Sequence, residues 1–218
     1  MKFFAINGSP RRKNNTMALL KACLKGVLSE RPKAETEIIN LYTLHYSGCT
    51  SCFACKKPAG KSYGKCKVKD ELGAVLRTLA RADGLIFGSP IYFSNITGEM
   101  RSFLERLLFQ YFVYDDLLSS LAPKKMPTAF IYTVGAPKQV MLEWKYPELL
   151  AGMEFIVEKV FSKPAVLYSC DTYQFDNYAE YKADRFSEPA KAKHRAEQFP
   201  TDLKEAFDIG AAMAKATE

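Results

Sequence analysis

The chain has 218 residues, of which 48% are hydrophobic and 25% are charged, a composition typical of a globular protein with one well-filled core. Its net charge of +7 would permit a nucleic-acid partner, but the sequence contains no nucleic-acid-binding motif, so we expect none. No apolar run approaches the ~20 residues that span a bilayer, and the basic residues at 11–13 follow the first apolar run instead of preceding it as in a signal peptide. We therefore expect a cytoplasmic protein without a membrane partner.

Strand-like and helix-like segments alternate along the chain. The helix over residues 100–111 has the clearest pattern, because apolar side chains recur at every third or fourth position on one face. Asp70 can cap a helix that runs to about residue 81. In chain order, the predicted elements are a strand at 2–7, a helix at 16–28, a strand at 37–41, a helix at 71–81, a strand at 84–90, a helix at 100–111, a strand at 128–134, a helix at 147–161, a strand at 165–169 and a helix at 203–214.

This alternation predicts an α/β protein with one domain over residues 1–218. Five strands separated by helices favour a three-layer, doubly wound parallel sheet in the flavodoxin-like order 2-1-3-4-5. Two further segments are a cysteine-rich loop at 45–69 and a polar, aromatic extension at about 171–200. Because long loops without structure are uncommon in compact domains, we expect the extension to cover the functional site or to cross to a partner subunit.

The loop after the first predicted strand has the composition of an anion site. Ligands of such sheets bind beyond the carboxyl ends of the strands, and a helix N-terminus there favours negative charge. Ser9, Arg11, Asn15 and Thr16 supply donors that suit a terminal phosphate monoester. The loop lacks both the lysine of a nucleoside-triphosphate loop and the G-x-G-x-x-G of a dinucleotide fold. The alternative is a plain strand-to-helix turn with a capping Asn.

The loops after the third and fourth predicted strands should meet at the same edge of the sheet. The third-strand loop carries two aromatic side chains and small polar groups, which suit a flat heteroaromatic ring. The alternative is that Tyr92 and Phe93 cover the core. The residues expected around such a ring are Pro90, Ile91, Tyr92, Phe93 and Ser94 from the third-strand loop, with Thr133, Val134 and Gly135 from the fourth.

Together these motifs resemble the family of NADPH-dependent FMN reductases and flavodoxin-like flavoproteins, especially the branch that includes iron–sulfur flavoproteins. The resemblance covers roughly residues 1–135 and rests on the segments 8–16, 88–93 and 98–106. It implies noncovalently bound FMN, with the phosphate on Ser9, Arg11, Asn15 and Thr16 and the ring between residues 90–94 and 133–135. It also implies a homodimer or homotetramer with flavin near the subunit interface.

Four of the six cysteines lie within eighteen residues, which is unusual for a chain of this composition. Cys49, Cys52 and Cys55 are separated by two residues each, and Cys66 follows after ten more. Thiolates at such spacing can hold a [4Fe–4S] cluster, and iron–sulfur flavoproteins resemble this pattern, although with a shorter final gap. Free or redox-active thiols, zinc and a disulfide are the alternatives.

The sequence offers no catalytic side-chain set, which fits an enzyme whose cofactor carries the chemistry. The resemblance implies an FMN-dependent NAD(P)H oxidoreductase, similar to quinone reductases, that passes hydride or electrons to a small acceptor such as a quinone, a flavin or a nitroaromatic compound. The alternative is an iron–sulfur flavoprotein that transfers electrons through a cluster on the cysteine loop.

Overall fold

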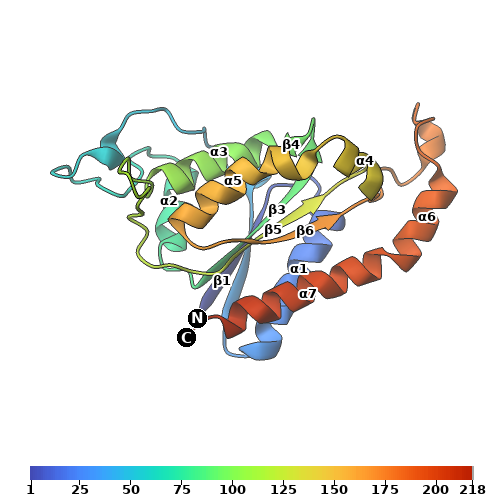
Figure 1. Ribbon diagram of the computed structural model, residues 1–218, viewed down its shortest axis with the longest axis horizontal. Coiled ribbons are helices and arrows are strands. Elements are labelled where there is room, and N and C mark those ends of the chain that lie inside the picture. Colours follow the sequence, from blue (N-terminus) through green and yellow to red (C-terminus); the bar gives the residue numbers. More distant parts are fainter. Residues whose placement is uncertain (218) are drawn as a thin grey trace.

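A mainly parallel β-sheet with helices on both faces organises the chain in the computed structural model, which describes residues 1–217 (Figure 1). The strands run in the order β2-β1-β3-β5-β6, and each pair of neighbours in this order is parallel. The short strand β4 pairs antiparallel with β3 in a hairpin. The strands are β1 (Lys2–Asn7), β2 (Glu35–Asn40), β3 (Gly84–Tyr92), β4 (Asn95–Ile96), β5 (Thr128–Thr133) and β6 (Ala165–Ser169).

Alternation along the strands divides the core into two layers. In β1, Phe3 and Ala5 pack on one side of the sheet, while Phe4 and Ile6 pack on the other. The first layer holds α1 (Asn15–Glu30) and α7 (Phe199–Lys215). The second holds α2 (Glu71–Leu79), α3 (Gly98–Phe109) and α5 (Tyr146–Val160). The predicted three-layer, doubly wound fold and its strand order are therefore confirmed, with β4 as an additional two-residue strand.

Two helices and three short 3₁₀ segments were not predicted. Helix α4 (Lys138–Glu143) precedes α5, and α6 (Glu188–Glu197) lies in the C-terminal extension. The 3₁₀ segments are Leu41–Thr43, Ala54–Lys56 and Tyr178–Glu180. The five predicted helices are all present, with ends shifted by a few residues.

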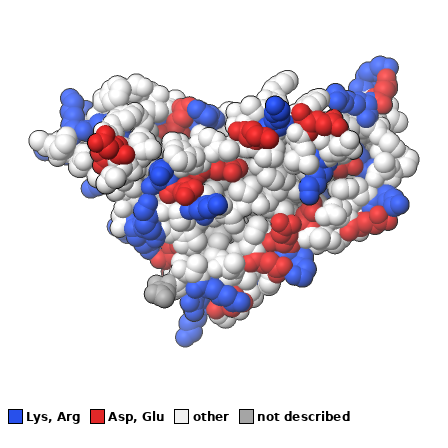
Figure 2. All heavy atoms as spheres, viewed as in Figure 1, with Lys and Arg blue, Asp and Glu red and all other residues white. Residues whose placement is uncertain are grey.

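The surface shows no region of a single charge sign on the face drawn in Figure 2, where basic and acidic side chains are interspersed. Among the helices formed by residues 1–217, none has the length and apolar character needed to cross a membrane.

Candidate functional site

The loops that follow β1, β3, β5 and β6 converge on a cleft of about 170 Å³ at the carboxyl edge of the sheet. Four segments line it, at 9–16, 90–92, 133–135 and 172–175. The predicted cofactor residues that line the cleft are Ser9, Arg11, Asn15, Thr16, Pro90, Ile91, Tyr92, Thr133 and Gly135. Residues distant in sequence are thus brought to one place, at the edge where this class of sheet binds its ligands.

The end of the cleft formed by the β1–α1 loop has the donors that an anion needs. The side chain of the N-cap residue Asn14 makes no capping hydrogen bond, and the first turn of α1 contains no acidic residue. The first N–H groups of the helix therefore keep their capacity to bind an anion. Ser9 is almost fully buried, and its Oγ accepts a hydrogen bond from the Arg11 backbone N–H at 3.2 Å. This donor set fits a phosphate monoester.

The hydroxyl groups of two predicted residues join the loops after β1 and β5. Thr16 Oγ1 and Thr133 Oγ1 lie 2.9 Å apart and share a hydrogen bond, and both side chains are buried. Thr97, which caps α3, donates from its hydroxyl to the carbonyl of Gly8 at 2.8 Å. The β1–α1 loop is therefore fixed from two sides by hydroxyl hydrogen bonds.

Three predicted residues do not line the cleft. Val134 is buried in the core, and its backbone N–H donates to the carbonyl of Ser169. Phe93 and Ser94 form the tip of the β3–β4 hairpin with positive φ angles of 49° and 66°. The side chain of Phe93 is fully exposed and Tyr92 is 45% exposed, so neither ring covers the core.

The C-terminal extension, which the sequence predicts to cover the functional site or to cross to a partner subunit, supplies the fourth side of the cleft, although none of its residues was among the predicted cofactor residues. Arg11 donates to the carbonyl of Gln174, and Asn15 Nδ2 donates to the carbonyl of Tyr173 at 2.8 Å. Arg195 of α6 donates to Asn15 Oδ1 at 2.6 Å. The extension therefore lies over the predicted phosphate residues of its own chain. The sequence signal for this covering segment was the aromatic composition of residues 173–186.

A buried lysine holds the extension against the loop after β5. Lys191 of α6 is 2% exposed and pairs with Asp171 Oδ1 at 2.7 Å. Its ammonium group also donates to the carbonyls of Gly135 at 2.8 Å and Thr172 at 3.3 Å. All three protons of the ammonium thus have an acceptor, as burial of a charge requires.

The four clustered cysteines line a second, smaller cavity of about 20 Å³ beside the C-terminal half of α3. All four are free thiols: Cys55 is buried, Cys52 is exposed, and Cys49 and Cys66 are half-buried. Burial raises the pKa of the Cys55 thiol, and the neighbouring thiols of Cys66 and Cys49 add to this effect against the charge of Lys56. Within residues 1–217, no three Cys, His, Asp or Glu side chains are arranged to hold a metal ion.

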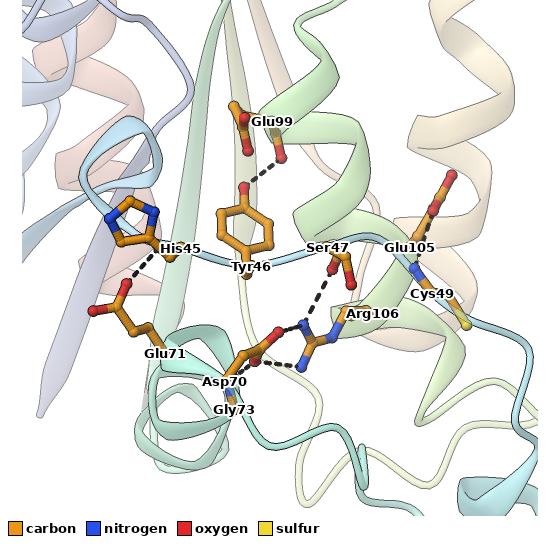
Figure 3. A network of polar contacts seen from close by, with 10 residues as sticks. All are labelled: His45, Tyr46, Ser47, Cys49, Asp70, Glu71, Gly73, Glu99, Glu105 and Arg106. Carbon is orange, nitrogen blue, oxygen red and sulfur yellow. Dashed lines mark hydrogen bonds and ion pairs between the residues drawn. The ribbon is translucent and has the colours of Figure 1, made fainter.

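The cysteine loop is anchored through the contacts of Arg106 (Figure 3). The side chain of Arg106 is completely buried. Its guanidinium pairs with both carboxylate oxygens of Asp70, with Nη2 2.9 Å from Oδ1, and Nη1 also donates to the carbonyl of Ser47 at 3.1 Å. Arg106 lines the cysteine cavity, and its buried Nε has no hydrogen-bond partner within the described chain. One free guanidinium N–H of Arg106 beside four thiols can donate to the negative charge that thiolates or a bound cluster would carry.

A family model described as NADPH-dependent FMN reductase matches residues 1–140. The chain is similar to an iron-sulfur flavoprotein of Methanocaldococcus jannaschii, with 34% identity over 106 residues that make up 49% of this chain and 51% of that protein. An iron-sulfur flavoprotein of Archaeoglobus fulgidus is 38% identical over 109 residues, which make up 49% of this chain and 48% of that protein. The matches thus span about half the length of these curated relatives.

Solved structures share the fold over nearly the whole chain. The NAD(P)H:quinone oxidoreductase from Methanothermobacter marburgensis superposes with a TM-score of 0.69 at 12% identity, over 97% of this chain and 96% of that one. An FMN-dependent NADH-azoreductase from Bacillus anthracis, solved in complex with FMN, gives a TM-score of 0.64 at 12% identity, over 98% of this chain and 100% of that one. At these identities the likeness establishes the fold.

Proposed function

Because this chain belongs to the NADPH-dependent FMN reductase family, we propose that it is an FMN-dependent oxidoreductase that takes hydride from NAD(P)H and reduces a small acceptor. The acceptor is a quinone, a flavin or a nitroaromatic compound. The observation that carries this proposal is the single cleft in which phosphate-binding donors of the β1–α1 loop meet the loops after β3 and β5. The names of the two solved structures, a quinone oxidoreductase and an azoreductase, are consistent with it.

Each side of the cleft has a distinct part in this function. Ser9, Arg11 and the N-terminal N–H groups of α1 bind the phosphate, with Asn15 and Thr16 beside them. Residues 90–92, Thr133 and Gly135 contact the ring and orient it. When bound there, FMN supplies the hydride-accepting chemistry that the side chains themselves lack. The extension shields the phosphate end from water.

The visible spectrum of the purified protein tests the proposal. We expect flavin absorption, or uptake of added FMN at one per chain, and NADPH oxidation that depends on a quinone acceptor. Protein that takes up no FMN would contradict the cofactor assignment. Protein that binds FMN but oxidises neither NADPH nor NADH would be an electron carrier instead of an enzyme.

We also propose that the chain forms a homodimer or homotetramer. The exposed Phe93 at the tip of a hairpin beside the cleft supports this proposal, because full burial of a phenylalanine side chain is favourable by about 1.5–3 kcal/mol. Light scattering after size exclusion should give two or four chains per particle. A monomer at micromolar concentration would contradict the proposal.

A second candidate function is electron transfer through an iron–sulfur cluster, in the manner that the names of the curated relatives indicate. Four thiols around one cavity and the unpartnered Nε of Arg106 support it. A neighbouring surface cleft of about 1010 Å³ suits an acidic electron-carrier protein, since its lining includes Lys57, Lys61, Lys65, Lys67 and Lys69.

Anaerobic purification with iron and sulfide analysis tests this second function. We expect about four irons per chain if the cluster forms, and loss of iron in Cys49→Ser, Cys52→Ser or Cys66→Ser. Cys170→Ala is the matched control, because Cys170 lies elsewhere, against Met141. Iron-free protein in which the clustered thiols react freely with a thiol reagent would support the free-thiol alternative.

A further inference from the structure

A further cavity, of about 440 Å³, adjoins the candidate flavin cleft on the side of α4 and the C-terminal extension, and we call it the aromatic cavity. The two spaces share Ile91, Gly135 and Gln174 in their linings. A molecule in the aromatic cavity would therefore lie beside the residues that we assign to the flavin ring. Its volume falls within the usual range for small-ligand sites.

Three aromatic side chains form part of the wall of this cavity. Trp144, Tyr146 and Phe186 line it, and Trp144 is 48% exposed although it is large and apolar. Such rings pack well against a flat aromatic molecule, in stacked or edge-to-face arrangements. The shape and chemistry of the wall therefore suit a planar aromatic ligand.

One guanidinium gives the cavity its charge. Asp171 and Lys191 also line it, but they pair with each other at 2.7 Å and neutralise one another. Arg185 lies over the Trp144 ring, 5.0 Å from its centroid, and forms no ion pair with any residue in the part of the chain that the structure describes. A guanidinium held against an aromatic face can bind a carboxylate or sulfonate through two parallel hydrogen bonds.

We propose that this cavity binds planar aromatic anions, and that aromatic carboxylates or sulfonates are the preferred electron acceptors of this chain. The acceptor part of the proposal rests on the proposed oxidoreductase function. Trp144, Arg185 and Phe186 all lie beyond residue 140, outside the region that the family model matches. The specificity therefore belongs to the C-terminal part of this chain.

The reaction balances for a nitroaromatic anion as acceptor. NAD(P)H gives up a hydride and becomes NAD(P)⁺, and its two electrons reduce the nitro group to a nitroso group. One N–O bond of the nitro group breaks. The released oxygen takes up two protons, one that arrived as the hydride and one from solvent, and leaves as water. Arg185 takes no part in this electron transfer and acts on the acceptor's carboxylate alone.

Trp144 provides a binding assay that needs no turnover, because it is the single tryptophan of the chain. The probes are 4-nitrobenzoate and its neutral isostere 4-nitrobenzamide, whose nitro groups quench tryptophan fluorescence; N-acetyltryptophanamide corrects for collisional quenching. We expect saturable quenching at about tenfold lower concentration for the carboxylate than for the amide, the advantage expected of hydrogen bonds to a charged group. In Arg185→Gln this difference should shrink to about twofold or less.

Lys193→Gln is the matched control, since it removes one positive charge from the exposed side of α6 without touching the cavity. It should keep the wild-type preference. Equal quenching by both probes in the wild-type protein, or an undiminished preference in Arg185→Gln, would overturn the proposal.

Steady-state kinetics separate this inference from the proposed function. The ratio of kcat/KM for 4-nitrobenzoate to that for 4-nitrobenzamide should fall about fivefold or more in Arg185→Gln and stay constant in Lys193→Gln. If the wild-type protein binds the carboxylate in preference to the amide but does not oxidise NAD(P)H, the proposed function fails and the anion site stands. If the enzyme reduces neutral quinones but shows no preference for the anion, the inference fails and the function stands.

Discussion

At the scale of single residues, Arg11 is the side chain on which the phosphate assignment most depends. Arg11 lines the candidate flavin cleft, and its guanidinium is the positive charge that the β1–α1 loop contributes to that cleft. Substitution Arg11→Ala should weaken FMN binding by about 1.5–3 kcal/mol, the range for hydrogen bonds to charged groups. Titration of flavin fluorescence measures the change. Arg12→Ala is the control, because Arg12 is exposed and does not line the cleft; equal losses in both variants would show a general charge effect instead of a specific contact.

Asp70 serves two structural purposes near the cysteine loop. It caps α2 by accepting from the Gly73 N–H at 3.0 Å, and it pairs with the buried Arg106. Burial raises the pKa of Asp70, but the hydrogen bonds from Arg106 and Gly73 and the charge of Arg106 outweigh it. The pKa of Asp70 therefore lies below its ordinary value of 3.8. The folded state thus favours the ionised carboxylate.

Replacing Asp70 with Asn keeps a capping oxygen but removes the charge that Arg106 needs. We expect the free energy of unfolding at pH 7 to fall by about 3 kcal/mol, as for other broken buried pairs. Because the pKa of Asp70 is lowered by folding, its contribution is complete above 3.8 and is lost as the pH falls through the folded pKa. The difference between wild type and Asp70→Asn in urea unfolding should therefore narrow below about pH 4. A constant difference down to pH 3 would contradict this account.

At the scale of elements, hydrophobic periodicity was sufficient to predict the five parallel strands of the sheet and the five helices that pack against the sheet. These elements bury apolar faces, and burial is what the sequence pattern records. Helix α6 was missed because Glu188–Glu197 carries no apolar side chain larger than that of proline and is held by polar contacts of Lys191 and Arg195. Its available signals were the Ser187 cap, which accepts from the Ala190 N–H, and Pro189 in the first turn.

The residues of the candidate site can likewise be separated into those that the sequence predicted and those that it did not. Residues of the loops after β1, β3 and β5 were predictable, because parallel strands bring their carboxyl ends to one edge. The contacts of residues 172–175 were not, since they are made largely by backbone carbonyls, which any sequence possesses. The burial of Val134, which directly follows β5, was also missed, because a fully buried strand has no alternating pattern that tells which neighbouring side chains enter the core.

Two glycines allow α1 and α7 to pack at close range. A Cβ atom at Gly210 would lie 1.8 Å from the Cys23 carbonyl oxygen, and one at Gly26 would lie 1.9 Å from that of Phe207. Because backbone atoms cannot move aside like a side chain, Gly210→Ala should lower the free energy of unfolding by about 3 kcal/mol. Gly152→Ala on α5 is the matched control. Its Cβ meets nothing within 4 Å, so it should stabilise the protein by about 0.5–1 kcal/mol. Chemical denaturation measures the free energy of unfolding of both variants. Similar changes in the two variants would refute the close-packing role of Gly210.

At the scale of the whole molecule, α3 connects the two candidate redox regions. Its N-cap Thr97 bonds to Gly8 of the phosphate loop, and its other end supplies Arg106 and Phe109 to the cysteine cavity. The linings of the flavin cleft and the cysteine cavity have no residue in common. The two regions are therefore physically separate within the described chain, although one helix joins them.

Hydrogen exchange with and without FMN should reveal this separation. Binding of the cofactor should slow exchange in peptides that cover residues 8–16, 88–95, 133–136 and 172–175, because these segments line the cleft or continue its loops. Peptides from the cysteine loop at 45–69 should exchange at the same rate in both samples, because they contribute nothing to the cleft.

The exchange rate of the segment 172–175 is the decisive measurement. If the extension covers the cofactor of its own chain, its protection should rise with that of residues 8–16 at the same FMN concentration. Protection of 8–16 alone would mean that the extension does not contact the cofactor, and protection of the cysteine loop would mean that α3 transmits binding from one end to the other.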